Sequence, residues 1–224
     1  MRSIIDNVER TIAVVGGTGA EGFGLALRFA RAGAAVRIGS RDLARAQEAA
    51  RRAGNGVVGM LNADAVRDAQ IVVLTVPLAA QIATLKSLKN SFQPGAILVD
   101  ATVPLEAAIG GRVSRTLALW AGSAAEQAAR YVPDGVAVVA AFHCLSAEVL
   151  AHADQPVDCD VLICGDSPDA KAAVRELVNL IPGARAVDAG PLENARLIES
   201  LAALLISLNL RHKVKGSGVR ITGI

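Results

Sequence analysis

The stretch VVGGTGAEGFGLALRFARAGAAVRIGSRD, from Val14 to Asp42, decides the fold. It carries the pattern GxGxxG as Gly17-Thr18-Gly19-Ala20-Glu21-Gly22, after an apolar β-rich run and before a run with helical spacing. In this pattern the first glycine makes a tight turn, the second lets the backbone approach a pyrophosphate, and the third lets the helix pack on the strand. The exposed amides and the helix dipole favour an anion. The context therefore predicts a dinucleotide site, whereas the pattern alone would also fit an ordinary β-turn-α joint.

The residues after the second expected strand, 35–39, indicate which dinucleotide binds. An NAD site usually has Asp or Glu there to bind the ribose hydroxyls, but this chain has Ser40 and Arg41. A guanidinium forks onto a 2′-phosphate, and a serine hydroxyl donates to it. Arg45 lies one helical turn beyond Arg41, and Asp42 is expected to cap that helix. We therefore predict NADP(H); the alternative is that both arginines are solvated surface charges.

Strand and helix patterns alternate along the chain. The expected strands are 11–15, 35–39, 57–60, 70–76, 96–100, 136–141, 161–164 and 184–188, with one further small strand at 219–224. The expected helices are 20–32, 42–52, 63–67, 79–88, 123–131, 168–181 and 191–210, the fifth opened by a Ser123–Glu126 capping box. This order predicts a Rossmann-type, doubly wound α/β fold with a parallel sheet. We expect a leading tail at 1–10, an NADP-binding Rossmann domain at 11–142, and a smaller C-terminal α/β part at 143–224.

Composition excludes several classes of function. Of the 224 residues, 52% are hydrophobic, 20% charged and only 3% aromatic, which suits a buried sheet covered by helices and argues against disorder. The net charge of +2 gives no sign of a nucleic-acid or membrane partner. We find no apolar run long enough to span a bilayer, and the start, MRSIIDNVER, is too polar for a signal peptide.

The cysteines and histidines show no metal-binding pattern. The three cysteines form no CxxC pair and the three histidines are scattered, so we predict no metal site. Reduced thiols and a cytoplasmic location are expected. Cys159 and Cys164 are expected to flank or line a buried strand, and Cys144 is interpreted as a packing residue.

Seven motifs in a fixed order carry a resemblance over nearly the whole chain, about 11–221. They are GGTGAEGFGLALRFARAG, IGSRD, LTVPL, DATVPL, LWAGSAAEQAAR, VDCDVLICGD and LENARLIES. The chain resembles the NADPH-dependent coenzyme F-420 reductases, the F-420H2:NADP oxidoreductases of methanogenic archaea and some bacteria. The motifs DATVPL, GSAAE and LENAR have no general Rossmann meaning, so they make the resemblance specific.

The resemblance implies an activity and a set of contacts. Members of the family pass hydride reversibly between C4 of the nicotinamide of NADP(H) and C5 of the deazaflavin, which lies in a cleft that the C-terminal part closes. By the same resemblance, the pyrophosphate is contacted by 18–21, the 2′-phosphate by Ser40, Arg41 and Arg45, the nicotinamide side by Val76, Leu78 and Val103, and the deazaflavin ring by Ala147. The segment AAFHCLSAEVL departs from the family pattern, because relatives carry His-Thr or Asn-Asn where this chain has His143 and Cys144.

Direct hydride transfer requires two stacked rings and no nucleophile, so we assign no catalytic residue. The small residues at Thr75, Val76, Pro77 and Leu78, and at 101–104, suit the close approach of two rings. Negative charge that develops on the N1/C2 edge of the deazaflavin needs a donor. The candidates are His143 and the backbone amides of Leu145 to Ala147; the alternative is a strand-end histidine whose hydrogen bonds are satisfied by the backbone.

Two features near the C-terminus suggest partners. The cations Arg211, His212, Lys213, Lys215 and Arg220 could attract the phosphate and polyglutamate tail of F-420, or could simply be a solvated helix end. The expected helix at 191–210 is apolar on several faces, which favours burial or pairing in a homodimer.

Two other functions remain open at this stage. One is an NADP-dependent reductase of another acceptor, a flavin or a ferric chelate, because fold does not determine substrate. The other is a non-catalytic NADP(H)-sensing module. Such a module would not need the small residues that allow a second ring to stack, so these residues argue against it.

Overall fold

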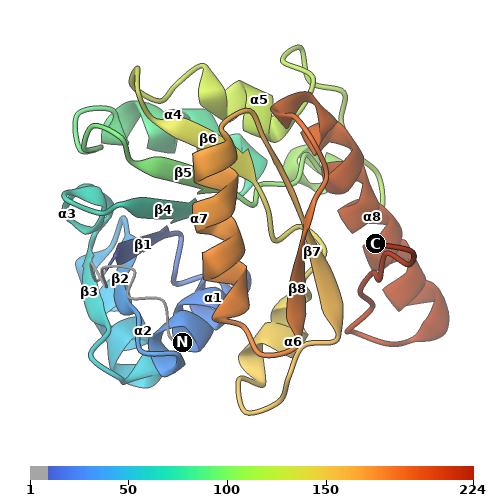
Figure 1. Ribbon diagram of the computed structural model, residues 1–224, viewed down its shortest axis with the longest axis horizontal. Coiled ribbons are helices and arrows are strands. Elements are labelled where there is room, and N and C mark those ends of the chain that lie inside the picture. The colour runs from blue at the N-terminus through green and yellow to red at the C-terminus, as the bar shows by residue number, and fades with distance from the viewer. Residues whose placement is uncertain (1–9) are drawn as a thin grey trace.

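The computed structural model describes residues 10–224 (Figure 1). The predicted leading tail lies outside these residues, apart from Arg10. The described strands are β1 (Thr11–Val15), β2 (Ala35–Ser40), β3 (Val58–Leu61), β4 (Ile71–Leu74), β5 (Ile97–Asp100), β6 (Ala137–Ala140), β7 (Cys159–Gly165) and β8 (Ala184–Asp188). The described helices are α1 (Ala20–Arg31), α2 (Leu43–Ala53), α3 (Asn62–Val66), α4 (Leu78–Leu88), α5 (Ala124–Ala129), α6 (Ala147–Ala151), α7 (Pro168–Asn179) and α8 (Ala195–His212), with short 3-10 turns η1 (Glu106–Ile109) and η2 (Leu192–Asn194).

The strands form a sheet in the order β3-β2-β1-β4-β5-β6-β7-β8. Strand β1 pairs in parallel with both β2 and β4, so the chain reverses its direction of winding between them. The carboxyl ends of strands at such a reversal form the crevice in which α/β proteins bind ligands. The Rossmann-type fold predicted from the sequence is confirmed, and its binding crevice lies beyond the ends of β1 and β4.

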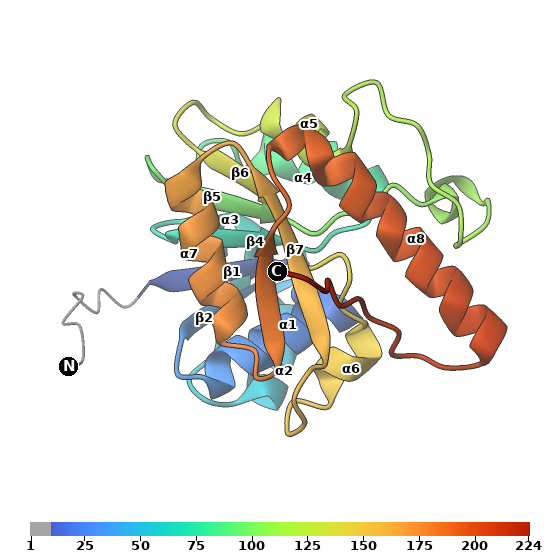
Figure 2. The same cartoon turned by 45° about the vertical axis from the view of Figure 1, so that its right-hand side comes forward.

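Strand β7 departs from the parallel arrangement. It runs antiparallel to β6 and pairs with it only at its last two residues, Cys164 and Gly165. The remainder of β7 therefore extends beyond the carboxyl end of β6, where it pairs in parallel with β8 over five residues. In Figure 2, β7 and β8 lie side by side, and the chain beyond α8 returns towards them.

The sheet is buried on both faces. Successive residues of β1 alternate between two hydrophobic clusters, with Ile12 and Val14 in one and Ala13 and Val15 in the other. The first cluster is covered by α1, α2 and α7, and the second by α3, α4 and α5. Such burial explains why the predicted strands read as continuous apolar runs.

Most of the helix and strand boundaries predicted from the sequence lie within one or two residues of those in the structure. The predicted caps are confirmed, since Asp42 accepts from the amide of Arg45 at 3.2 Å and the Ser123 hydroxyl accepts from the amide of Glu126 at 3.0 Å. Cys159 and Cys164 lie buried in β7, as expected. In the part of the chain that the structure describes, no helix is long and apolar enough to span a membrane.

Two sequence predictions about local structure are wrong, and one helix was not predicted. The small strand expected at 219–224 does not form, because the amide of Ile221 bonds to the Asp160 side chain instead of to a neighbouring strand. The last long helix begins at Ala195 rather than Pro191, since the chain first forms the turn η2. Helix α6 was not expected; its carbonyls are satisfied by a side chain more than 100 residues away, which periodicity does not reveal.

Candidate active site

The glycine loop between β1 and α1 is closely packed. A Cβ on Gly22 would lie 2.4 Å from Thr75 Oγ1 and 2.8 Å from the Gly16 carbonyl oxygen, so only glycine fits. Gly16 itself has φ +84°, and a Cβ there would lie 2.8 Å from the Thr75 carbonyl. Gly19 is the N-cap of α1 and supplies no side-chain hydrogen bond, which leaves the first amides of that helix for a ligand. Gly22 thus allows α1 to begin in close contact with Thr75 and the loop backbone. Gly16 was not predicted from the sequence.

A first cavity, of about 360 Å³, lies beside this loop at the end of β2. It is lined by Gly16, Thr18, Gly19, Ser40, Arg41, Asp42, Arg45, Asn62, Thr75, Val76, Pro77, Ala80 and Thr84. Ser40, Arg41 and Arg45 thus share one cavity, as the sequence predicts. Within residues 10–224 neither arginine pairs with a carboxylate, and both side chains are exposed.

Two residues that line the first cavity, Ser40 and Asn62, each have unused hydrogen-bonding capacity. The Ser40 hydroxyl accepts from the Asp42 amide at 3.1 Å, so its own proton remains free to be donated. The buried Oδ1 of Asn62 has no hydrogen-bond partner among the described residues. A buried unsatisfied acceptor costs about 1–3 kcal/mol. The cavity therefore suits a ligand that carries both an anion and a hydrogen-bond donor; Asn62 was missed, because one asparagine after a strand has no distinctive sequence signal.

A second cavity, of about 490 Å³, adjoins the first, because Gly19, Thr75, Val76 and Pro77 line both. Among the other predicted site residues it is lined by Ala20, Glu21, Val103, His143, Leu145 and Ala147. Ala101, Thr102 and Ser146, which lie in segments that the sequence also suggested, line it too. The remaining lining residues were not suggested as ligand contacts: Leu105, Cys144, Ala202, Leu205, Ile206, Asn209 and Ser217. Three predicted residues line neither cavity, namely Gly17, Gly22 and Leu78. The two glycines are buried under the loop, and Leu78 begins α4.

His143 lies at the edge of the second cavity in a strained turn. The preceding residue, Phe142, is buried with φ +74°, a conformation that bulky residues rarely adopt. The His143 side chain is only 7% exposed, and neither ring nitrogen has a hydrogen-bond partner among the described residues. Burial lowers the pKa of His143 to about 4, so the imidazole is neutral at physiological pH and can donate from one nitrogen.

Buried carboxyl groups support the other side of the cavity. Asp100, at the end of β5, accepts from Thr102 Oγ1 at 2.6 Å and from Gln81 Nε2 at 2.8 Å. Glu199, on α8, accepts from the amides of Ala124 and Ala125 at the start of α5. These bonds hold α8 and the loop after β5 on the same core. Residues of α8 and of this loop line the second cavity.

These carboxyl groups have raised pKa values. Burial raises the pKa of Asp100 to about 7 and that of Glu199 to about 8, although hydrogen bonds to both act in the opposite direction. Burial, with a smaller contribution from Asp100, raises the pKa of Glu21 to about 8. At neutral pH Glu199 and Glu21 are therefore mostly protonated, and Asp100 is about half protonated.

The ligand-free protein is expected to lose stability as the pH rises from about 6.5 to 8. A carboxyl group with a raised pKa holds its proton more tightly in the folded state, so the free energy of unfolding falls as the pH rises through the folded pKa. The lowered pKa of His143 opposes this only below its unfolded value of 6.5. We expect Asp100 and Glu199 together to lower the free energy of unfolding by about 2 kcal/mol between pH 6.5 and 8. Urea unfolding at each pH measures this change.

The variant Asp100→Asn supplies the control for this pH effect. It is expected to be less stable at every pH, because an amide cannot accept from all the donors of Asp100. Its decline between pH 6.5 and 8 should nevertheless be shallower, since one titrating group is gone. An equally steep decline in the variant would show that Asp100 does not hold a proton in this range.

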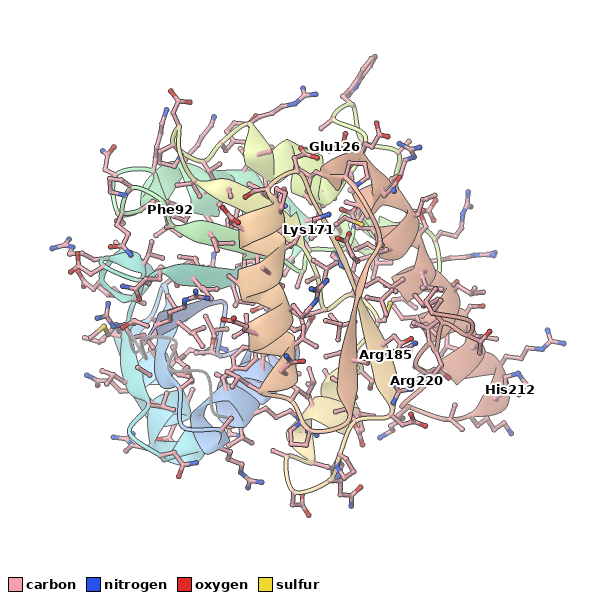
Figure 3. The ribbon with its side chains drawn as sticks, in the orientation of Figure 1. Phe92, Glu126, Lys171, Arg185, His212 and Arg220 are labelled. Carbon is pink, nitrogen blue, oxygen red and sulfur yellow. The ribbon has the colours of Figure 1, made fainter. Side chains whose placement is uncertain are left out.

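The C-terminal cations do not form one free cluster. Arg220 pairs with Asp158 and with Asp160, so it is not available to an anionic tail as the sequence suggested. Lys215 pairs with Glu148 at 3.4 Å, on the surface. His212 lies at the far end of α8, away from Arg185 and Arg220 (Figure 3).

A Rossmann sheet, a glycine loop and two adjoining cavities at its carboxyl edge define the class of nicotinamide-dinucleotide oxidoreductases. The family profile described as NADP oxidoreductase, coenzyme F-420-dependent, matches residues 11–104. The F-420-dependent NADP reductase of Methanothermobacter thermautotrophicus is 49% identical over 95% of both chains. That of Methanothermobacter marburgensis is 48% identical over 95% of this chain and 98% of its own. The chain belongs to the family of coenzyme F-420-dependent NADP oxidoreductases.

A solved structure agrees with this assignment over almost the whole fold. A crystal structure from Arthrobacter sp. FB24, provisionally assigned as an F-420-dependent NADP reductase, superposes with a TM-score of 0.82. The two sequences are 26% identical, and the match covers 95% of this chain and 99% of the other. The similarity therefore includes the C-terminal part that borders the second cavity.

Proposed function

We propose that this protein transfers hydride reversibly between NADP(H) and the deazaflavin coenzyme F-420. The observation that carries the proposal is that two cavities meet at Thr75, Val76 and Pro77, one cationic and one lined mainly by small and apolar residues. Two planar rings that enter from opposite cavities would meet over this strand end. The identity of 49% with a named F-420-dependent NADP reductase supports this choice of second substrate.

For NADP(H), the proposed contacts follow the first cavity. The amides at the start of α1 would bind the pyrophosphate, because Gly19 leaves them without a side-chain cap. Arg41 and Arg45 would pair with the 2′-phosphate, and the Ser40 hydroxyl would donate to it. The unpartnered Oδ1 of Asn62 would accept from the ligand. When bound, the dinucleotide supplies the hydride, and these residues hold it in place and exclude water.

For F-420, the proposed contacts follow the second cavity. Val103 and Ala147 would bring small side chains against the rings, which permits close approach. The neutral His143 would donate a hydrogen bond to the edge on which negative charge gathers, as would the amides near Leu145. The two ring nitrogens of His143 are buried and have no hydrogen-bond partner among the described residues, which fits a polar edge of the ligand.

A spectroscopic assay tests this function. Purified protein is mixed with NADPH and oxidised F-420, and the deazaflavin absorbance is followed; we expect bleaching, and its recovery when reduced F-420 is mixed with NADP. Turnover only with a flavin or a ferric chelate would instead identify another reductase. Binding of NADPH without turnover of any acceptor would identify a sensing module.

We also propose a homodimer in the cytoplasm, with the chain divided into an NADP-binding domain at 11–142 and a smaller part at 143–224. The outer face of α8 supports the dimer, because Leu197 and Leu204 are seven residues apart and 60% and 54% exposed. Unpaired thiols at all three cysteines support the location. Sedimentation should give twice the 23.0 kDa of one chain, and a mass near one chain would rule out the dimer.

A further inference from the structure

We propose that residues 213–221, called the strap, position the wall of the second cavity, and that Arg220 and Asp160 are positioning residues for the second substrate. The inference rests on the proposed function, since it concerns how that substrate's cavity keeps its shape. The strap leaves the end of α8 and returns across the molecule to β7 (Figure 2). It therefore connects elements on two sides of the cavity.

The first half of the strap holds the end of α8 next to α6. The amide of Ser217 donates to Asn209 Oδ1 at 3.0 Å, and both residues line the second cavity. The hydroxyl of Ser146, another lining residue, donates to the carbonyl of Lys215 at 2.5 Å. A Cβ on Gly216 would lie 2.8 Å from Val149 Cγ2, so the strap is in close contact with α6.

The second half is anchored to β7 through Asp160, whose side chain is fully buried. Its carboxylate accepts from Arg185 Nε at 2.9 Å, from Arg220 Nη1 at 2.8 Å and from the amide of Ile221 at 2.7 Å. The backbone amide of Asp160 donates to the carbonyl of Val219 at 2.7 Å. Arg185 and Arg220 lie side by side at this anchor (Figure 3). One buried carboxylate thus ties β7, β8 and the strap together.

Contacts lead from this anchor to the cavity itself. The amide of Val219 donates to Cys159 Sγ at 3.4 Å, and Cys159 Sγ donates to the carbonyl of Cys144 at 3.5 Å. Cys144 lines the second cavity next to His143. No residue of the strap lines the first cavity. Release of the strap should therefore disturb the site of F-420 and leave that of NADP(H) intact.

The test compares Arg220→Ala and Asp160→Asn with wild type. Both variants are expected to raise the KM for F-420 about 3- to 30-fold, with the Kd for NADPH unchanged within about twofold. The two substitutions change the local charge in opposite directions, so simple attraction of an anionic substrate predicts opposite effects on KM. A lower KM for F-420 in Asp160→Asn would therefore overturn the inference.

Arg175→Ala is the matched control, because it removes an exposed arginine of α7 that lines neither cavity. Its KM for F-420 should equal that of wild type, and Arg220→Lys should recover much of the loss seen in Arg220→Ala. An equal rise in KM in the Arg175→Ala control would overturn the inference.

Amide hydrogen exchange, measured without F-420, gives a second readout. Both strap variants should exchange faster at 213–221 and also at 143–149, whereas exchange around β1 and β2 should stay unchanged. Unchanged exchange at 143–149 would overturn the inference even if the strap itself exchanged faster. If the wild-type protein did not reduce F-420, the proposed function would be wrong. The exchange measurement would still test the role of the strap, because it uses no F-420.

Discussion

Arg41→Ala is expected to weaken NADPH binding about 10- to 150-fold and to leave NADH binding nearly unchanged. The loss corresponds to about 1.5–3 kcal/mol for a hydrogen bond to a charged group. Arg41 lines the first cavity, is exposed, and has no carboxylate partner within the described range 10–224. The two Kd values are measured by titration calorimetry in one buffer. Because the contact is at the surface, the loss should shrink at high salt.

The control for this prediction is Arg51→Ala on the same helix, α2. Arg51 is 72% exposed and pairs with Glu48, and surface pairs of this kind contribute little. We expect no change in the Kd for either dinucleotide. If Arg41→Ala weakened NADH as much as NADPH, Arg41 would not bind the 2′-phosphate, and the preference for NADP(H) would need another origin.

Arg28→Leu is expected to lower the free energy of unfolding by about 3–5 kcal/mol. Arg28, on α1, is only 2% exposed and donates to four carbonyls at the end of α6 and just beyond it. Leucine would fill part of the space but would leave buried acceptors without donors. A Cβ on Gly24 would lie 2.6 Å from Leu150 Cβ, so α1 and α6 are in close contact one turn away from Arg28.

Urea unfolding measures this loss, and Arg31→Leu on the exposed side of α1 is the control, with an expected change below about 0.5 kcal/mol. A loss below about 1 kcal/mol for Arg28→Leu would mean that the carbonyls find other donors. Below its unfolding temperature the variant should also show a raised KM for F-420, because α6 begins at Ala147 in the wall of the second cavity.

The binding half of the site was accessible from sequence because its signals are local. One signal is the glycine pattern after the first strand, and the other is the type of residue just past the second strand. The parallel sheet brings the ends of these two strands to one edge. Ser40, Arg41 and Arg45 therefore lie in one cavity although no distance between them was known. The same reasoning predicted the caps at Asp42 and Ser123, because a cap concerns residues three apart.

The wall of the second cavity could not be predicted in this way. Arg28 bonds to a carbonyl 122 residues away, and Ile221 bonds to a carboxylate 61 residues away. Nothing in the spacing around Arg28 distinguishes it from an exposed arginine on an amphipathic helix. Asp160 lies in an apolar strand pattern. Its partners Arg185 and Arg220 are distant in the sequence, and only the folded chain brings β8 and the strap next to it.

The sequence by itself determined the class of sheet, the order of its elements and the cationic dinucleotide end, because hydrophobic periodicity and turn chemistry act between near neighbours. The tertiary structure alone decided that β7 turns antiparallel, that α6 forms, and that the chain after α8 returns to Asp160. These features depend on pairing of buried polar groups between distant segments, and only the packed chain specifies which groups meet.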